Sequence, residues 1–263
     1  GAGLVVGKVN PERAGVEFGA GMIASELDDL GRAAKVSREG NGPVSLATWG
    51  EKGLEEVPPL WMLKYLPNMP SCHASIALDL RGPSNTITES DSASLLALGE
   101  AYHIIQRDDA DLFIVGGTES KMTPLAQTRH NLFQKLSQRN NEPEKAHRPF
   151  DRDRDGSVMG EAAAAFTLEE LEHAKKRGAK IIAELVGFGC GLARDGVGMG
   201  VLIRETLERA GVRPEEVDHI NAHGIATDVG DPFEAKAINA VFGAKVPVWA
   251  IKGNIGASGA ASS

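Results

Sequence analysis

The chain has 263 residues, of which 42% are hydrophobic and 24% charged, a composition typical of a globular protein with a full hydrophobic core. Its net charge of -8 and pI of about 5.4 argue against nucleic-acid and membrane-surface partners. No apolar run approaches the roughly 18 residues that span a bilayer, and no signal peptide is recognisable. Two cysteines form no disulfide framework, so the cytoplasm is the expected compartment.

Apolar or β-branched stretches predict strands at 14–19, 84–88, 111–117, 162–168, 181–189, 217–223 and 246–252. The amphipathic or apolar stretches between them predict helices at 92–107, 124–136, 169–177, 200–210 and 231–242. Alternation of this kind is typical of a mostly parallel sheet that is covered by helices on both faces. The predicted class is therefore α/β.

Asp91 lies between Ser90 and Ser92, directly before the apolar helix predicted at 92–107. An aspartate or serine at a helix start is an ordinary N-cap, worth about 1 kcal/mol. From the residues alone, the N-cap interpretation of Asp91 is favoured over a chemical role.

A polar, turn-rich stretch at 137–157 is too long for a plain connection. It runs into "RPFDRDRDGSVMGEAAAAF", in which acids and arginines alternate before an apolar strand. A charge run is usually a solvated loop. The alternation is equally compatible with a network of ion pairs that fixes the loop, with Glu161 buried beside the sheet.

His223 ends a predicted strand and is followed by Gly224. A histidine there can act as a donor or base in a cleft, but a structural histidine is slightly more frequent. Lys252 precedes a glycine-rich turn whose amides could hold an anion, although a lone lysine at such a place is usually exposed. The histidines have no metal-ligand spacing and "VGFGCG" matches a dinucleotide fingerprint only in part, so no metal and no cofactor are expected.

Taken together, the longer motifs resemble those of one family, the beta-ketoacyl-ACP synthases, and are most similar to type II. They are "LPNMPSCHASIALDLRGPSNTI", "GEAYHIIQRDDADLFIVGGTES", "PFDRDRDGSVMGEAAA", "LEELEHAKKRGAKIIAELVGFG", "INAHGIATDVGD" and "KGNIG". The resemblance covers nearly the whole chain and keeps the order of the motifs.

This resemblance implies a thiolase-like layered α-β-α-β-α fold with mostly parallel sheets, here incompletely represented at both ends. Residues 1–180 would be the N-terminal half, without its start, and residues 181–263 the beginning of the C-terminal half. In the family, a cysteine at the start of a buried helix takes an acyl group from acyl-ACP. Malonyl-ACP then decarboxylates, and its carbanion attacks the acyl thioester. Two histidines, a lysine and a glutamate support these steps.

Carried over position by position, the first histidine of the family falls on His223, the lysine on Lys252 and the glutamate on Glu161. Asp91 takes the place of the nucleophilic cysteine, and Ala257 takes the place of the second histidine. A carboxylate is electrostatically favoured at a helix start. It is a poor nucleophile toward a thioester, because the anhydride formed would be more reactive than the thioester consumed.

The resemblance therefore leaves three hypotheses. The first is a condensation-incompetent relative that pairs with an active synthase, as chain-length factors do. The second is an enzyme with altered chemistry on ACP thioesters, such as decarboxylation or hydrolysis. The third is a module that binds acyl-ACP without turnover. In each, the expected partners are acyl carrier protein with its acyl or malonyl phosphopantetheine thioester, and a second subunit in a homodimer or heterodimer.

Overall fold

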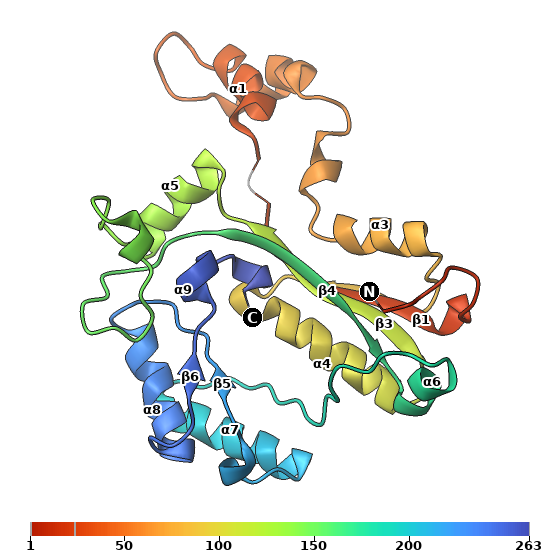
Figure 1. Ribbon diagram of the computed structural model, residues 1–263. Helices are drawn as coiled ribbons and strands as arrows, with labels where there is room; N and C mark the ends of the chain where they lie inside the picture. Colours follow the sequence, from red (N-terminus) through yellow and green to blue (C-terminus); the bar gives the residue numbers. More distant parts are fainter. Residues whose placement is uncertain (1, 24, 263) are drawn as a thin grey trace.

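The apolar stretches at 14–20 and 112–120 form the two central strands of a four-stranded sheet. The structure is a computed structural model that describes residues 2–23 and 25–262. The strands are β1 (Ala14–Ala20), β2 (Ser84–Ile87), β3 (Leu112–Ser120) and β4 (Glu161–Glu169), in the order β2-β1-β3-β4 (Figure 1). β1 runs parallel to β2 and β3, whereas β4 runs antiparallel to β3. The mostly parallel sheet is thus confirmed, with β4 as its antiparallel member.

Helices cover both faces of this sheet. The helix α4 (Ala93–Gln106) lies on one face, where its alanines pack with Phe113 and Val115 of β3. The helix α3 (Met69–Leu78) lies on the other face, beside the core cluster Ala14, Val16, Leu80 and Leu112. Small side chains let α4 approach the sheet closely: a Cβ added to Gly19 would lie 2.3 Å from the backbone nitrogen of Ser94. The sequence predicted α4, but it did not predict α3.

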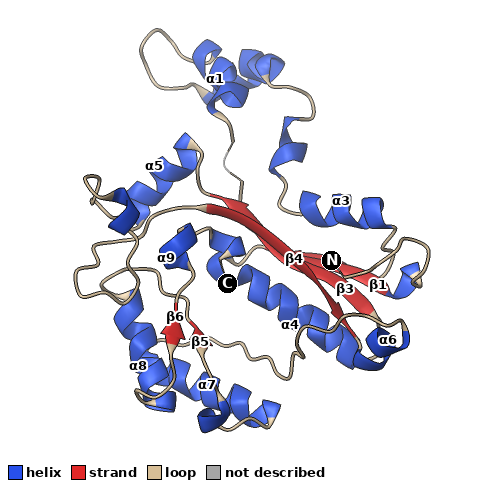
Figure 2. Cartoon of the chain, viewed as in Figure 1, coloured by secondary structure: helices blue, strands red, loops and turns tan. Residues whose placement is uncertain are grey.

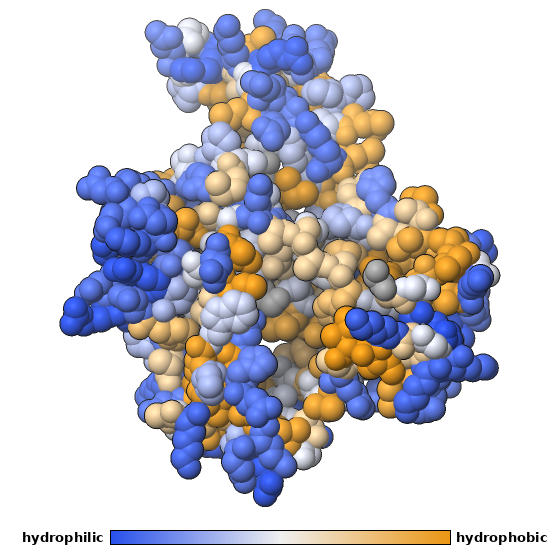
Figure 3. Space-filling view, viewed as in Figure 1, coloured by the Kyte–Doolittle hydropathy of each residue, from blue (hydrophilic) through white to orange (hydrophobic). Residues whose placement is uncertain are grey.

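A lobe projects from the sheet between β1 and α3 (Figure 1). It contains α1 (Leu27–Val36), the short α2 (Leu46–Thr48) and several single turns that end at Tyr65. Lys64 Nζ lies 2.6 Å from Asp29 Oδ2, and the Tyr65 hydroxyl donates to the same carboxylate. Figure 3 shows hydrophilic and apolar side chains mixed on the visible side of this lobe. The sequence analysis did not predict α1.

The C-terminal part contains two longer helices and two very short strands. The helices are α7 (Gly196–Ala210) and α8 (Gly230–Phe242), which lie side by side (Figure 1). The strands β5 (Ile220–Asn221) and β6 (Val248–Trp249) pair in parallel, and α9 (Lys252–Ile255) follows β6. Two further helices flank β4: α5 (Pro124–Phe133) before it and α6 (Leu171–Lys176) after it. All of these helices except α9 were predicted.

The strand predicted at 181–189 is wrong: this segment is a loop between α6 and α7 (Figure 2). Ile181, Ile182 and Val186 are exposed, and the segment pairs with no neighbouring strand among the described residues. The ring of Phe188 occupies the space that a Cβ on Gly99 of α4 would take, and Gly189 lies against Thr206 of α7. Since a strand needs a ladder partner, the local apolar pattern was not sufficient to form one.

No helix in the described part of the chain is both long and apolar enough to cross a membrane.

Candidate active site

Asp91 lies in a single helical turn, Ser90–Ser92, just before α4. Its carboxylate oxygen Oδ2 is 3.7 Å from His223 Nε2, and both side chains are about one-third exposed. The N-cap of α4 is Ser92, not Asp91, and Ser92 makes no side-chain capping bond. The structure therefore assigns the cap position to the residue directly after Asp91. The carboxylate lies beside the helix N-terminus and faces an imidazole.

His223 follows β5 at the start of a turn that two buried carboxylates hold in place. Glu234 on α8 accepts hydrogen bonds from the backbone nitrogens of His223, at 2.7 Å, and Gly224, at 2.8 Å. Asp231, one helical turn earlier on α8, accepts from the backbone nitrogens of Ile225 and Ala226. Together they bind four successive amides of the turn 223–226. Hydrogen bonds to a carboxylate are stronger than those between neutral groups, so the backbone of His223 is rigidly placed.

Asp231 also connects this turn to the loop that precedes β4. Its Oδ2 accepts a hydrogen bond at 2.5 Å from the backbone nitrogen of Phe150, a residue with φ of 62°. Arg154 Nε lies 3.8 Å from the same oxygen and donates to the carbonyl of Thr227 at 2.8 Å. The charged loop is therefore fixed by a network of polar contacts, as one of the two sequence interpretations proposed.

Lys252 is buried, whereas a lone lysine at this place was expected to be exposed. Its Nζ donates a hydrogen bond to the carbonyl of Ser262. Burial lowers the pKa of Lys252, and the negative charges of Asp91 and Glu234 oppose this shift. The ammonium group thus lies within electrostatic reach of the carboxylate of Asp91.

The pKa of His223 is also lowered, first by burial and then by the positive charge of Lys252. The carboxylates of Asp91, Glu234 and Asp231 act in the opposite direction. A lowered pKa favours the neutral imidazole at pH 7, which can donate one hydrogen bond to an oxygen and need not lose a proton first. Asp91, His223 and Lys252 form one cluster of groups.

Ala257, which the resemblance predicts at the second-histidine position, is buried, and its backbone groups are hydrogen-bonded. Its nitrogen donates to the carbonyl of Val158 at 2.8 Å, and its carbonyl accepts from Gly160 at 3.0 Å. This pairing places the turn after α9 against the segment that leads into β4. A methyl side chain cannot donate a hydrogen bond, so Ala257 adds no second donor to the cluster.

Glu161, by contrast, lies outside the cluster. It is exposed at the start of β4, where it accepts a hydrogen bond at 2.7 Å from Ser120 Oγ. The expectation of a Glu161 buried beside the sheet is therefore wrong. The carboxylates that act on Lys252 are Asp91 and Glu234. The pair Asp231 and Glu234, spaced three residues apart at the start of α8 and close after His223, was the sequence signal that could have identified them.

Glu119 of β3 is a further buried carboxylate that the sequence analysis missed. It accepts a hydrogen bond at 2.7 Å from the backbone nitrogen of Ala260 and forms an ion pair with Lys121. Gly21 and Gly259 approach this carboxylate so closely that a Cβ on either would collide with it. Glu119 thereby fixes the glycine-rich turn after Ala257 to the sheet.

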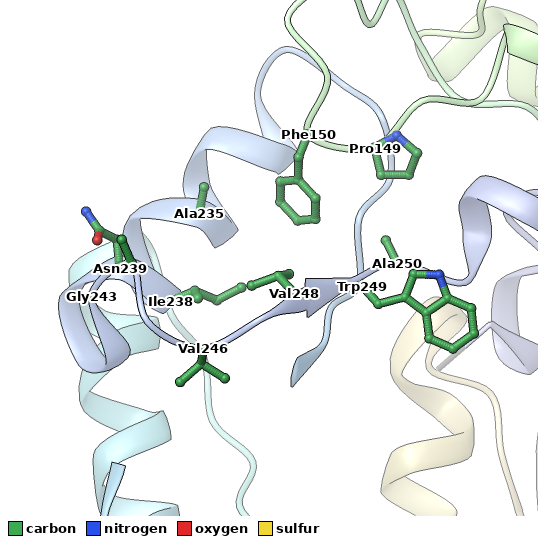
Figure 4. A pocket seen from close by; sticks show the side chains of 11 residues that line it. Pro149, Phe150, Ala235, Ile238, Asn239, Gly243, Val246, Val248, Trp249 and Ala250 are labelled. Atoms are coloured by element: carbon green, nitrogen blue, oxygen red, sulfur yellow. The ribbon is translucent and has the colours of Figure 1, made fainter. Parts of the chain in front are cut away.

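Two cavities are found among the described residues, and the cluster residues line neither. A small one, of about 70 Å³, is lined by residues of α4, β3 and β4, including Ser94, Leu98 and Gly117. A larger, open one of about 520 Å³ lies between α8 and β6 (Figure 4). Its walls are mostly apolar, with Phe150, Ile238 and Val248 pointing inward. Asp91, His223 and Lys252 do not line it. The described residues contain no group of three or more metal-ligand side chains.

Comparison with known proteins gives a consistent result. Residues 2–174 match the model of the beta-ketoacyl synthase N-terminal domain, and residues 189–263 match that of the C-terminal domain. The chain is 38% identical over 250 residues to the 3-oxoacyl-[acyl-carrier-protein] synthase 2 of Coxiella burnetii, covering 92% of this chain and 57% of the relative. The corresponding protein of Vibrio cholerae gives the same identity and coverage. The chain thus spans less than two thirds of these relatives.

Solved structures with the same fold include a beta-ketoacyl synthase from Burkholderia phymatum, with a TM-score of 0.81 and 31% identity over 97% of this chain and 61% of the other. The ishigamide ketosynthase/chain length factor has a TM-score of 0.81 and 28% identity over 99% of this chain and 62% of the other. A type II polyketide ketosynthase in complex with its acyl-carrier protein has a TM-score of 0.83 and 26% identity over 99% of this chain and 65% of the other. The fold is the α/β, thiolase-like fold of ketosynthases.

Proposed function

Because the chain belongs to the beta-ketoacyl synthase family, we propose that it is a condensation-incompetent member that acts as a chain-length-factor-like partner of an active synthase. The observation that supports this proposal is the carboxylate of Asp91 at the start of α4, 3.7 Å from His223, where the family resemblance places a cysteine thiol. The division of the chain near residue 180 into two thiolase-like halves belongs to the same proposal, since it also rests on the resemblance.

The chemistry of the cluster supports inactivity. An aspartate that attacked a thioester would form a mixed anhydride, which is higher in energy than the thioester. Removing the nucleophile of a catalytic unit can cost on the order of 10⁶ in rate. The methyl group of Ala257 removes one donor, and loss of a single oxyanion donor costs roughly 10² to 10³. Neither His223 nor Lys252 can supply the missing acyl-accepting atom as the site is built.

The surrounding scaffold is nevertheless intact, which favours a retained binding role. Lys252 and Glu234 remain buried, and the amides of the turn 223–226 remain held. A chain that had lost all use for the site would not need buried charges, which cost free energy unless they are paired. Acyl carrier protein and its thioesters are the proposed partners, by analogy with the type II polyketide ketosynthase that was solved in complex with its carrier protein.

A second candidate function, altered thioester chemistry, is favoured by the contact between Asp91 and His223. A carboxylate beside an imidazole can orient it as a base toward water, as in hydrolases. Decarboxylation of malonyl-ACP is less compatible with the site, because the negative charge of Asp91 would repel the malonyl carboxylate.

The third candidate, a binding module, has the small cavity beside Ser94 as its support. Ala93→Phe, in the buried first turn of α4, would weaken acyl-ACP binding if an acyl chain lies beneath that helix.

Intact mass spectrometry of the protein with an acyl-ACP and malonyl-ACP tests the proposal. We expect no elongated beta-ketoacyl-ACP and no acyl adduct on the protein. Elongation by the unmodified protein would overturn the proposal, and release of carbon dioxide or free thiol above background would favour altered thioester chemistry.

The variant Asp91→Cys is the matched positive control. Because it places a thiol at a helix N-terminus, where thiolates are stabilised, we expect it to gain the mass of one acyl group. Asp91→Ser puts a hydroxyl at the same position, and because a hydroxyl does not ionise at neutral pH as a thiol does, this variant should gain none. An acylated Asp91→Cys protein would show that thioesters enter the site and that the missing thiol is the reason for inactivity.

A further inference from the structure

The open cavity between α8 and β6 has the size and the lining of a small-molecule site. Its volume of about 520 Å³ lies in the range of roughly 300 to 1,000 Å³ in which such sites fall. Phe150, Ile238 and Val248 point inward, and no charged side chain belongs to the lining that the structure describes (Figure 4). Asn239 and Trp249 supply the polar side-chain atoms of this lining. The cavity therefore suits an uncharged, mostly apolar molecule with one polar group.

The wall of this cavity packs directly on Gly224, the residue after His223. Gly224 has a φ of 48°. A Cβ added to it would lie 2.5 Å from Ala250, 3.0 Å from Pro149 and 3.2 Å from Phe150, three residues of the cavity wall. Not even a methyl group fits between the wall and the turn. A molecule that shifts or fixes these side chains must therefore act on the backbone beside His223 as well.

Asp231 makes a second connection between the cavity and the turn. One carboxylate oxygen accepts a hydrogen bond from the backbone nitrogen of Phe150 at 2.5 Å. The other accepts from the backbone nitrogens of Ile225 and Ala226, at 3.0 and 2.9 Å. Phe150 has a φ of 62°, which is uncommon for a residue other than glycine and persists only where surrounding contacts hold it. The ring that points into the cavity is thus held by the carboxylate that also holds the turn.

Both sets of contacts lie on one helix. Asp231 and Glu234 of α8 bind the turn 223–226. The same helix lines the cavity with Ala235, Ile238 and Asn239. Residues three and four positions apart are neighbours on the surface of a helix, so the two sets adjoin each other. A displacement of α8 at the cavity is therefore also a displacement of the carboxylates that hold the turn.

We propose that the cavity between α8 and β6 binds an uncharged apolar molecule with a single polar group, and that its occupation acts on His223 through Gly224 and Asp231. The molecule packs between Phe150 and Ile238, and it thereby holds the loop before β4 against α8. This reduces the opening of the turn 223–226. The inference goes beyond the proposed function and does not depend on it, because the residues of the candidate active site do not line the cavity.

Tryptophan fluorescence of the full chain tests binding, with 1-octanol as the probe. Trp49 and Trp61, which lie in the projecting lobe, are replaced by phenylalanine, so that the signal comes from Trp249 in the cavity wall. We expect a saturable change with a Kd below about 1 mM. Octanoate has the same chain length but carries a charge, so it should bind at least about tenfold more weakly. A signal that does not saturate, or equal binding of octanoate, would overturn the proposal.

Variants of α8 test whether the alcohol occupies this cavity. Ala235→Phe fills the cavity from the exposed side of the helix, and we expect it to weaken octanol binding at least about tenfold. Val201→Phe on α7 is the matched control, because this position is 46% exposed and lies outside the lining, and affinity should stay unchanged. Circular dichroism shows whether each variant folds. If Ala235→Phe does not fold, Asn239→Ala decides, and it should bind the alcohol at least about threefold more weakly. Unchanged affinity in the deciding variant would contradict the proposal.

Hydrogen exchange tests the action on the turn. Saturating octanol should slow exchange of the amides of Ile225 and Ala226 at least about threefold, because the bound molecule stabilises the closed turn. The amide of Ala33, a buried residue of the lobe, should exchange at an unchanged rate. Unchanged exchange at Ile225 and Ala226 while the cavity is saturated would overturn the coupling to His223. None of these measurements depends on whether the chain elongates acyl-ACP.

Discussion

The central sheet and the C-terminal turn region keep their shapes by different interactions. In the sheet, β1 and β3 are held by burial, with Val16, Phe113 and Val115 fully inaccessible to solvent. In the C-terminal region, β5 and β6 have two residues each, and Val248 and Trp249 are 43% and 56% exposed. Because so little apolar surface is buried in this region, the hydrophobic effect alone cannot hold its turns firmly.

The turn 223–226 is instead held by hydrogen bonds to Asp231 and Glu234. These bonds are directional, so they fix the orientation of His223 more closely than apolar contacts would. The shape of the sheet therefore depends on packing, whereas the position of His223 depends on hydrogen bonds to buried carboxylates. Substitutions should therefore have different consequences in the two regions.

Loss of a packed core side chain should destabilise the fold strongly. Phe113→Ala removes a fully buried ring between β3 and α4, and we expect it to lower the free energy of unfolding by about 4 kcal/mol. Phe166→Ala is the control, because this ring on β4 is 51% exposed and its loss should cost much less. Urea unfolding followed by circular dichroism measures both. Equal losses would mean that the sheet does not depend on burial at Phe113.

The buried Glu17 should make the sheet region depend on pH. Its pKa is raised from 4.5 to about 8 in the folded protein, so the folded state retains a proton that the unfolded state loses. Stability should therefore decline by roughly 1.4 kcal/mol per pH unit as pH rises from about 4.5 to about 8, and then level off. Glu17→Gln should remove this part of the decline, which thermal unfolding at pH 5 and pH 8 measures. An unchanged decline would show that Glu17 is ionised in the fold.

Loss of one of the carboxylates that hold the turn 223–226 should act mainly on that turn. Asp231→Asn turns one accepting oxygen into a donor that opposes the amides it held, and we expect a loss of about 2 kcal/mol in unfolding free energy. Hydrogen exchange of the amides of Ile225 and Ala226 should accelerate, while that of Val115 in the core should not. Asp218→Asn, an exposed position, is the control. Faster exchange throughout the sheet would contradict a local role.

Of these substitutions, Asp91→Asn should have the smallest effect on stability, because it changes only an electrostatic contact. Asp91 opposes the lowering of the pKa of His223 by burial and by Lys252. Asp91→Asn should therefore lower the pKa of the His223 imidazole further, which an NMR titration of the imidazole resonances measures. Because the side chain keeps its size, unfolding free energy should hardly change. A raised pKa would show that the contact at 3.7 Å does not act as an ion pair.

Local pattern was a sufficient guide for most strands and helices with a sustained apolar or amphipathic run. The strands β1, β3 and β4 and the helices α4, α7 and α8 were predicted close to their observed bounds. The pattern failed at 181–189, which forms a loop although it is apolar, and at α1 and α3, which it did not predict. Strand formation depends on a partner that may lie far away in sequence, and periodicity does not report that partner.

The sequence by itself determined the family, through long motifs in the family's order. The assignment of Asp91 and Ala257 to the family's cysteine and second-histidine positions is a prediction from the resemblance. Only the tertiary structure decided which groups meet. In the folded chain Asp91 lies beside His223, and Lys252 is buried. Glu161 lies outside this cluster, and Glu234 acts on Lys252 instead. Burial and electrostatic contact are properties of neighbours in space, and residues far apart in the chain become neighbours only when the sheet, α4 and the C-terminal turns pack together.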